Sequence, residues 1–282
     1  MKKRYFAALL FAPILTTPTL GQSFIGEGIN TALEAVQEGL DLIWPDELSL
    51  EDVNARIGFG LGATPDYVGS DDYRFRVIPL LDIRYKDAWR LNGSLLTFSA
   101  LHEKKFEMGP LLNYRLGRPE GRNPALDGIG SIKTTFEIGA FARYKSKNAL
   151  FSVDYRHGLG ANIRSSVRVS AGHGIYKNGD FLAMLGARAK WLSKGSMQTE
   201  FGITPQQAES SVQGLDAFET RAGLSEVSAN LVGAYKLNEK TRLLSLISYG
   251  HLLGDAKNSP LVSNGVGSPS QFVVGAGLAF NF

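Results

Sequence analysis

The sequence predicts an all-β protein: an antiparallel transmembrane β-barrel of about 10–12 strands, with twelve preferred, and a short N-terminal amphipathic helix. Three observations predict it: apolar residues alternate with small or polar ones at the end of the chain, the same alternation recurs from residue 52 onward, and the N-terminus is typical of an exported protein. Alternation alone is also typical of soluble sheets, so the fold class depends on all three.

The final stretch of the chain has the clearest pattern. Six apolar residues share one parity and are expected to form a lipid-facing stripe: Phe272, Val274, Ala276, Leu278, Phe280 and Phe282. Because successive side chains of a strand point to opposite faces, the small and polar residues between them share the other face. Tilted by about 45°, a strand of this length rises about 25 Å, the height of the apolar band of an outer-membrane barrel. Such a strand crosses a bilayer only within a closed barrel, where every backbone group is paired.

Charged residues lie in the middle of the predicted strands, opposite the apolar ones. Eight of them are expected to line the lumen: Arg56, Glu137, Arg143, Arg156, Arg168, Arg188, Lys190 and Lys236. In a soluble barrel these charges would coat the outside, whereas in a membrane barrel they face inward and the apolar residues face lipid. The export segment, strand lengths near ten residues and aromatic residues at strand ends favour the membrane barrel.

The chain divides into three parts. Residues 1–21 have a basic start, an apolar stretch and then small residues, which is typical of a cleaved signal peptide. Residues 22–51 predict a periplasmic helical extension, because five apolar residues recur at helical spacing among acidic ones: Ile29, Leu33, Val36, Leu40 and Ile43. Three interpretations of this segment stay open: it docks a partner, it covers the mouth of the barrel, or it is a weakly helical linker. Residues 52–282 are assigned to the outer-membrane β-barrel.

Eleven strands are expected in the barrel region, among them less cleanly alternating ones at 73–85, 88–101, 103–117 and 241–253. An even number is typical of bacterial barrels. Residues 195–203 are the candidate for the twelfth strand, and ten strands remain the alternative. Short connections such as Asn178-Gly179 predict hairpin turns. Longer loops are expected at 65–72, 118–131, 204–225 and 254–269.

The composition excludes several kinds of site. The chain has no cysteine, so thiol catalysis, disulfides and cysteine-based zinc sites are excluded. Its net charge of +3 is too small to predict binding to nucleic acid. The four histidines form no zinc-protease motif, and the local pairs at 154–157 and 248–251 are better interpreted as polar lumen or interfacial side chains. The carboxylates of Asp66, Asp71 and Asp72 predict turn structure rather than a cation site. We predict no catalytic residue, cofactor or metal.

Two blocks of the sequence carry a family resemblance. Residues 65–73 read Pro-Asp-Tyr-Val-Gly-Ser-Asp-Asp-Tyr, and residues 253–262 read Leu-Gly-Asp-Ala-Lys-Asn-Ser-Pro-Leu-Val. With the segments at 114–118, 197–208 and 222–227, they make the chain from about residue 52 to Phe282 resemble the MipA/OmpV family. The resemblance implies a barrel without enzymatic activity in the outer membrane of a Gram-negative bacterium. It implies as partners a lytic transglycosylase that hydrolyses murein and a murein synthase, and it offers no catalytic residues.

The predicted function is therefore that of a non-enzymatic scaffold for peptidoglycan-remodelling enzymes. A small anion-preferring channel or uptake pore is the alternative, because arginine and lysine are expected to line the lumen. A surface adhesin that binds through the longer loops is a further alternative.

Overall fold

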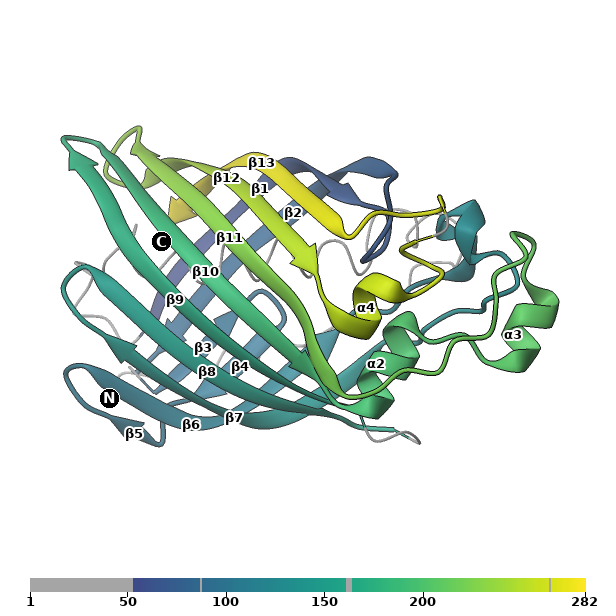
Figure 1. The fold of residues 1–282 in the computed structure, drawn as a ribbon. Helices are drawn as coiled ribbons and strands as arrows, with labels where there is room; N and C mark the ends of the chain where they lie inside the picture. The colour runs from purple at the N-terminus through teal and green to yellow at the C-terminus, as the bar shows by residue number, and fades with distance from the viewer. Residues whose placement is uncertain (1–52, 87, 161–163, 264) are drawn as a thin grey trace, which may run out of the picture.

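The protein is described by a computed structural model covering residues 53–86, 88–160, 164–263 and 265–282. The predicted signal peptide (1–21) and helical extension (22–51) lie outside the described residues. Within them the chain forms one antiparallel sheet that closes on itself as a barrel (Figure 1). The predicted antiparallel β-barrel is confirmed, while the N-terminal helix stays a prediction.

The barrel wall is made of strands that follow one another along the chain. They are β1 (Val53–Pro65), β2 (Tyr73–Tyr85), β3 (Trp89–Asn92), β4 (Leu95–Phe98), β5 (Leu101–His102), β6 (Phe106–Arg115), β7 (Thr135–Lys145), β8 (Ala149–Gly158), β9 (Arg164–Asn178), β10 (Phe181–Leu192), β11 (Gly223–Lys236), β12 (Thr241–Leu252) and β13 (Ser270–Asn281). Neighbours in sequence pair in space, and β1 pairs with β13 from Arg56 opposite Asn281 to Ala63 opposite Val274. The first and last strands therefore close the barrel.

The wall has twelve strands, because β4 and β5 both pair with β6 and together form one interrupted strand. The preferred count is confirmed, but the predicted source of the twelfth strand is wrong. Residues 195–203 form no strand; most of them belong to helix α2 (Lys194–Phe201). The missing strand comes from residues 88–101, where one long strand was expected and both β3 and β4 lie, joined at Gly93 with φ of 57°.

The helices gather at one end of the barrel (Figure 1). Besides α2 they are η1 (Glu120–Arg122), η2 (Pro124–Leu126), α3 (Pro205–Ser210) and α4 (Gly254–Asn258). They belong to the longer connections, while hairpin turns and the C-terminus lie at the opposite end (Figure 1). In the described part of the chain, no helix combines the length and the apolar character needed to cross a membrane.

The outer face of the wall is apolar, and the buried charged residues of the wall lie on its inner face. Along β1, Phe59 and Leu61 point outward and are 57% and 62% exposed, while Arg56 points inward and is 3% exposed. On the C-terminal strand the expected lipid-facing residues Phe272, Val274, Ala276 and Phe282 are exposed, and Leu278 and Phe280 are half-exposed. This distribution is the reverse of a soluble barrel, whose apolar side chains fill the interior.

Two close approaches of backbone explain why glycine occupies particular wall positions. A Cβ atom at Gly58 would overlap the carbonyl oxygen of Leu278 on β13, at the seam that closes the barrel. A Cβ atom at Gly109 would overlap the carbonyl oxygen of Phe98, next to the interruption between β4 and β5. Only a residue without a side chain fits where another backbone comes this close.

Candidate functional site

The long connections fold together into a structure that we call the cap: residues 66–72, 116–134, 193–222 and 253–269. One buried cluster joins all four connections: Tyr67, Ala125, Leu126, Ile129, Ile203, Leu215 and Leu261. The Tyr67 hydroxyl donates hydrogen bonds to the backbone carbonyls of Leu261 (2.9 Å) and Val266 (3.1 Å). Burial raises the pKa of this hydroxyl well above its usual value. The cap is thus a packed unit with its own apolar core.

Helix α2 fastens the cap to the barrel wall. Ser193 begins the helix as N-cap, its hydroxyl accepting a hydrogen bond from the backbone N–H of Ser196. The apolar side of α2 carries Met197 and Phe201, which pack in a second buried cluster with Leu192, Leu252, Ala256 and Val262. These partners belong to the ends of β10 and β12 and to the connection around α4, so the helix spans the wall and the cap.

Glu200 is the polar anchor of α2. Its carboxylate is 3% exposed and forms ion pairs with Arg115 (Nη2 to Oε1, 2.8 Å) and Lys190 (Nζ to Oε2, 3.4 Å). Arg118 also donates a hydrogen bond to the Glu200 backbone carbonyl at 3.0 Å. Burial alone would raise the pKa of Glu200, but the charges and hydrogen bonds of Arg115 and Lys190 lower it to about 2. Glu200 is therefore ionised at neutral pH and attracts the cap to the wall.

The loop at 66–72 is fixed by a second buried carboxylate. Asp66 forms ion pairs with Arg74 (Nε, 3.1 Å) and Arg76 (Nη2, 3.5 Å). Asn123 donates from its side-chain amide to Asp72 at 2.8 Å. The carboxylates of Asp66 and Asp72, which were considered as ligands for a cation, thus bind arginine and asparagine side chains. Within the described residues no group of carboxylates and histidines is arranged to hold a metal ion.

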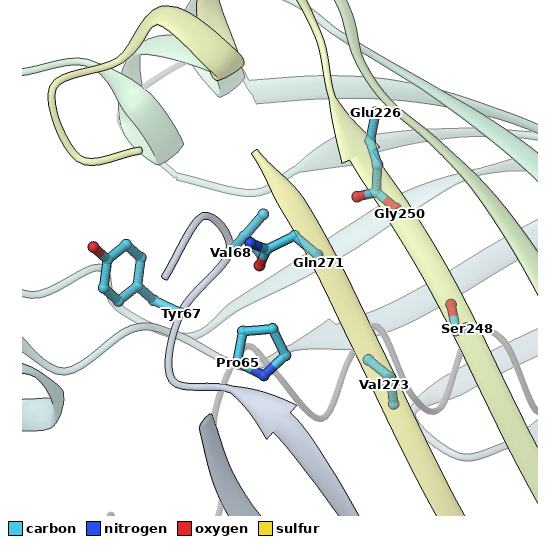
Figure 2. A pocket seen from close by; sticks show the side chains of 8 residues that line it. All are labelled: Pro65, Tyr67, Val68, Glu226, Ser248, Gly250, Gln271 and Val273. Carbon is cyan, nitrogen blue, oxygen red and sulfur yellow. The ribbon is translucent and has the colours of Figure 1, made fainter. Parts of the chain in front are cut away.

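A small cavity lies where the cap meets the inner wall. Figure 2 shows Gln271 of β13 beside Val68 of the loop, with Glu226 and Ser248 on neighbouring strands. Gln271 accepts a hydrogen bond from the backbone N–H of Gly69 (3.0 Å) and donates one to the Ser70 carbonyl (3.2 Å). The cavity measures about 20 Å³, room for about one water molecule. It is too small to admit a substrate.

The structure places most of the predicted lumen charges inside the barrel. Five are buried: Arg56, Glu137, Arg156, Arg168 and Arg188. Arg143 and Lys190 are partly buried and pair with Glu107 (3.3 Å) and Glu200. Lys236 differs, because it lies where β11 ends and pairs with the exposed Glu239 of the hairpin turn at 2.7 Å. It belongs to the rim rather than to the middle of the wall.

Several inward residues were missed by the sequence analysis. Asp82 on β2 accepts from both Arg56 (3.2 Å) and Arg90 (2.7 Å) and joins three neighbouring strands. Glu226 on β11 pairs with Arg188 at 3.4 Å. Both lie in predicted strands or at their edges, where the alternation of side chains could have assigned them to the inner face. Alternation could not identify Glu200, because residues 195–203 were predicted to be a strand and most of them form helix α2.

The two local histidine pairings do not form acid–base pairs. On β8, Asp154 points inward and bonds to Arg156 at 2.6 Å, whereas His157 lies on the outward parity. The His157 ring instead contacts the Ser165 hydroxyl (2.9 Å), and that hydroxyl also contacts Tyr155 (3.1 Å). His251 on β12 lies near the hydroxyl of Ser270 in a similar arrangement, with Nδ1 and Oγ 3.3 Å apart. These groups are polar contacts at the cap end of the outer wall.

A comparison with models of protein families identifies the family of the chain. The model of the family described as "MltA-interacting protein MipA" matches residues 57–282. The chain belongs to this family. Family and barrel architecture together make it an outer-membrane β-barrel, which agrees with the resemblance noted in the sequence. No curated protein matches the chain.

Solved structures are similar to the chain at low sequence identity and with TM-scores of 0.40 or below. A KdgM porin is 8% identical, with 80% of this chain and 99% of that one covered and a TM-score of 0.40. The NanC porin is 10% identical (81% and 98% covered, TM-score 0.40). OmpT of Vibrio cholerae is also 10% identical (83% and 99% covered, TM-score 0.38). These likenesses concern the barrel fold alone.

Proposed function

We propose that the protein is a non-enzymatic anchor in the outer membrane, which holds a murein lytic transglycosylase, and with it a murein synthase, at the periplasmic face. The description of its family supports this proposal, because the family is named for interaction with MltA. The short hairpin turns mark the periplasmic end, since outer-membrane barrels have short periplasmic turns and longer extracellular loops. The partner would therefore bind at the end opposite the cap.

The observation that carries the proposal is a lysine-rich periplasmic rim. Exposed lysines lie at the turns between strands: Lys86, Lys104, Lys105, Lys147, Lys177 and Lys240. The same turns carry fewer exposed carboxylates among their described residues: Glu103, Asp180 and Glu239. A ring of positive charge attracts an acidic protein surface and orients it, which is how charged rims contribute to recognition. We expect the partner to present carboxylates to this rim.

Binding of a purified partner tests the proposal. The mature barrel in lipid nanodiscs would be titrated with the soluble domain of a lytic transglycosylase from the same bacterium. Replacing Lys104, Lys105 and Lys147 by glutamate should weaken binding by at least about tenfold, and the intact protein should lose affinity as salt rises. The matched control reverses Lys133 and Lys257, which are exposed at the cap end. That variant should bind like the intact protein.

Two outcomes would contradict the proposal. The intact barrel fails to bind any lytic transglycosylase of its own cell, or both sets of reversals weaken binding equally. Binding of purified murein in place of the enzyme would assign the rim to the polymer instead. A variant lacking residues 23–50 belongs in the same titration, because that segment is the other predicted docking element.

The anion-preferring pore and the adhesin remain alternative predictions. The arginine-rich inner wall favours the pore, whereas the packed core of the cap favours a closed extracellular end. Single-channel recording in a planar bilayer separates the two. We expect no steady current from the intact chain, and a steady anion-selective current would favour the pore.

A further inference from the structure

One strand of the wall has a long edge without a neighbour. Strand β2 pairs with β1 along its whole length, Tyr73–Tyr85, but β3 pairs only with Asp82–Tyr85. The hairpin of β3 and β4 turns at Gly93, whose backbone N–H donates to the Leu81 carbonyl at 2.7 Å. In the described part of the chain, no backbone hydrogen bond joins residues 73–80 to any segment except β1.

The free backbone groups of this edge belong to alternate residues. Successive residues of a strand point their N–H and C=O groups to opposite sides, so the residues that share the parity of Leu81 face the missing neighbour. They are Tyr73, Phe75, Val77 and Pro79. Proline has no N–H to offer a neighbouring strand and is therefore confined to strand edges and bulges. Its presence at position 79 agrees with an edge that no strand covers.

The free edge lies at the level of the membrane. Its outward side chains are lipid-facing: Phe75 is 80% exposed, and Val77 lies opposite the lipid-facing Leu61 of β1. The Tyr73 hydroxyl accepts a hydrogen bond from the Phe272 backbone N–H at 3.0 Å, so these two rings mark the aromatic belt at the cap end and the rest of the edge lies below it. Hydrocarbon offers no partner to backbone groups, so a free edge at this depth is tolerated only where protein covers it or water reaches it.

Edge, turn and cap surround a break in the hydrogen bonding of the wall, which we call the wall gap. It is bounded by residues 73–80 of β2, the turn at 93–94, the cap-side end of β6 and the cap segment at 122–123. The turn reaches β6 through the Ser94 carbonyl, which accepts from the Tyr114 N–H at 3.0 Å. Toward the cap, Arg74 donates to the backbone carbonyl of Arg122 at 3.2 Å. Eight residue steps tilted by about 45° make the free edge about 19 Å tall.

A buried arginine on the same strand has a nitrogen without a partner. Arg76 lies between two residues of the free edge, points inward and is 1% exposed. Its Nε donates to the Thr64 hydroxyl at 2.8 Å, and its Nη2 pairs with Asp66 at 3.5 Å. Asp66 is shared with Arg74, whose Nε lies 3.1 Å from the same carboxylate. The Nη1 of Arg76 is buried and donates to no acceptor. A buried charged donor is costly to leave unpaired, so this nitrogen is suited to an anionic oxygen.

From these observations we infer that the wall gap is a water-lined side entrance to the barrel, which binds a single-chain anionic amphiphile of the fatty-carboxylate class. Its carboxylate accepts from Nη1 of Arg76 and from the free N–H groups of Phe75 and Val77, and its acyl chain lies in the bilayer against the outward side chains of the edge. A monoanion fits better than a phosphate dianion, because the Asp66 carboxylate lies on the same arginine. This inference goes beyond the proposed scaffold and does not depend on it.

Residue-resolved hydrogen exchange tests the free edge. In the folded barrel in nanodiscs, the amides of Phe75 and Val77 should exchange at least about 100-fold faster than those of Arg76 and Ile78, which face β1. The matched control is Leu61 on β1, a strand with neighbours on both sides, whose amide should exchange as slowly as that of Arg76. Equal protection of the four β2 amides would overturn the inference.

Cysteine labelling tests whether water reaches the wall gap, and the chain is suited to it because it contains no cysteine. Val77→Cys and Leu61→Cys place a thiol at two outward positions that lie opposite each other in register, one at the gap and one in the closed wall. A charged methanethiosulfonate should modify Val77→Cys at least about tenfold faster, because the reactive thiolate forms only where water reaches the sulfur. Heat-dependent mobility on gels checks that each barrel is folded. Equal rates at the two positions would overturn the water-lined entrance.

Oleate added to the nanodisc lipid tests the ligand. It should slow the labelling of Val77→Cys by at least about tenfold, whereas oleyl alcohol, which has the same chain without the charge, should leave the rate unchanged. Arg76→Gln should remove the effect of oleate, and Lys257→Gln, a change at the exposed cap end, should preserve it. The comparison of the two compounds needs no change at Arg76, so it also decides the case if that variant does not fold.

Equal protection by oleate and oleyl alcohol would overturn the anionic ligand, and protection by neither would overturn the binding site. Protection that survives in Arg76→Gln would overturn the role of this arginine. Transglycosylase binding is a separate readout. Its loss with an intact oleate effect would count against the proposed scaffold only.

Discussion

Neutralising Glu200 should loosen the cap without opening the barrel wall. The substitution Glu200→Gln keeps the shape of the side chain but removes the charge that faces Arg115 at 2.8 Å and Lys190 at 3.4 Å. Breaking a buried ion pair by removing one partner costs about 3–5 kcal/mol. Arg115 also lies 3.6 Å from Glu137, so it keeps a second carboxylate and the cost should be near the lower end. We expect about 3 kcal/mol.

Hydrogen exchange measured by mass spectrometry reads this loss locally. At 1.36 kcal/mol for each tenfold change, a loss of about 3 kcal/mol speeds amide exchange in α2 by about 100-fold. Peptides from β7 and β8, away from the cap, should exchange as before. The matched control is Glu219→Gln, which breaks the pair with Lys194, where both side chains are more than 60% exposed. An exposed pair contributes at most about 1 kcal/mol, so its effect should be under about tenfold.

The reasoning would be refuted by equal exchange rates in α2 for Glu200→Gln and the intact protein. It would also be refuted if both substitutions accelerated exchange to the same extent, because burial would then make no difference. Acceleration throughout the wall would show that the cap does not open as a separate unit.

Three further results are expected. The pKa of Glu200 is lower in the folded protein than its ordinary value of 4.5, so its ion pairs stabilise the cap fully above pH 4.5 and lose this effect as the pH falls toward about 2. Amide exchange in α2 should therefore rise between pH 4.5 and about 2 in the intact protein and should not change with pH in Glu200→Gln. Ile247→Lys, at the outward middle of β12, should destabilise the barrel by about 2–4 kcal/mol in urea unfolding, while Leu237→Lys at the rim costs about 0–1 kcal/mol; equal costs would contradict the lipid-facing assignment. Gly58→Val should abolish folding, scored by heat-dependent mobility, because its side chain would overlap the Leu278 carbonyl; a normal folded yield would mean that the seam adapts.

The barrel was predictable from sequence because its strands obey one simple rule. Side chains alternate between lipid and lumen, so a parity that carries Phe59 and Leu61 must be separated from one that carries Arg56. For residues 88–101 the same rule predicts one long strand, because the residues on both sides of Gly93 are compatible with a strand. The turn at Gly93 is therefore not predicted. Only pairing with β2 and β6 distinguishes two short strands from a long one.

The cap was much less predictable, because short segments are consistent with more than one period. Met197 and Phe201 are four apart, which fits one side of a helix and also one face of a strand. The structure shows Ser193 capping α2, a helix start that the sequence analysis did not identify. The contacts that hold the cap, such as Tyr67 to Leu261, join residues 194 positions apart and leave no local trace. Charge pairs within the lumen, such as Arg90 with Asp82, likewise depend on which strands become neighbours.

In the proposed orientation the cap faces the outside of the cell, so its assembly determines which surfaces antibodies or phages can recognise. Four connections as far apart in sequence as Tyr67 and Leu261 share one small apolar core, so any outward patch of this region combines pieces from distant parts of the chain. Antibodies or phages that recognise the native bacterium should then read discontinuous epitopes. Sera raised against linear peptides from these loops should bind the denatured polypeptide on a blot but leave intact cells unstained.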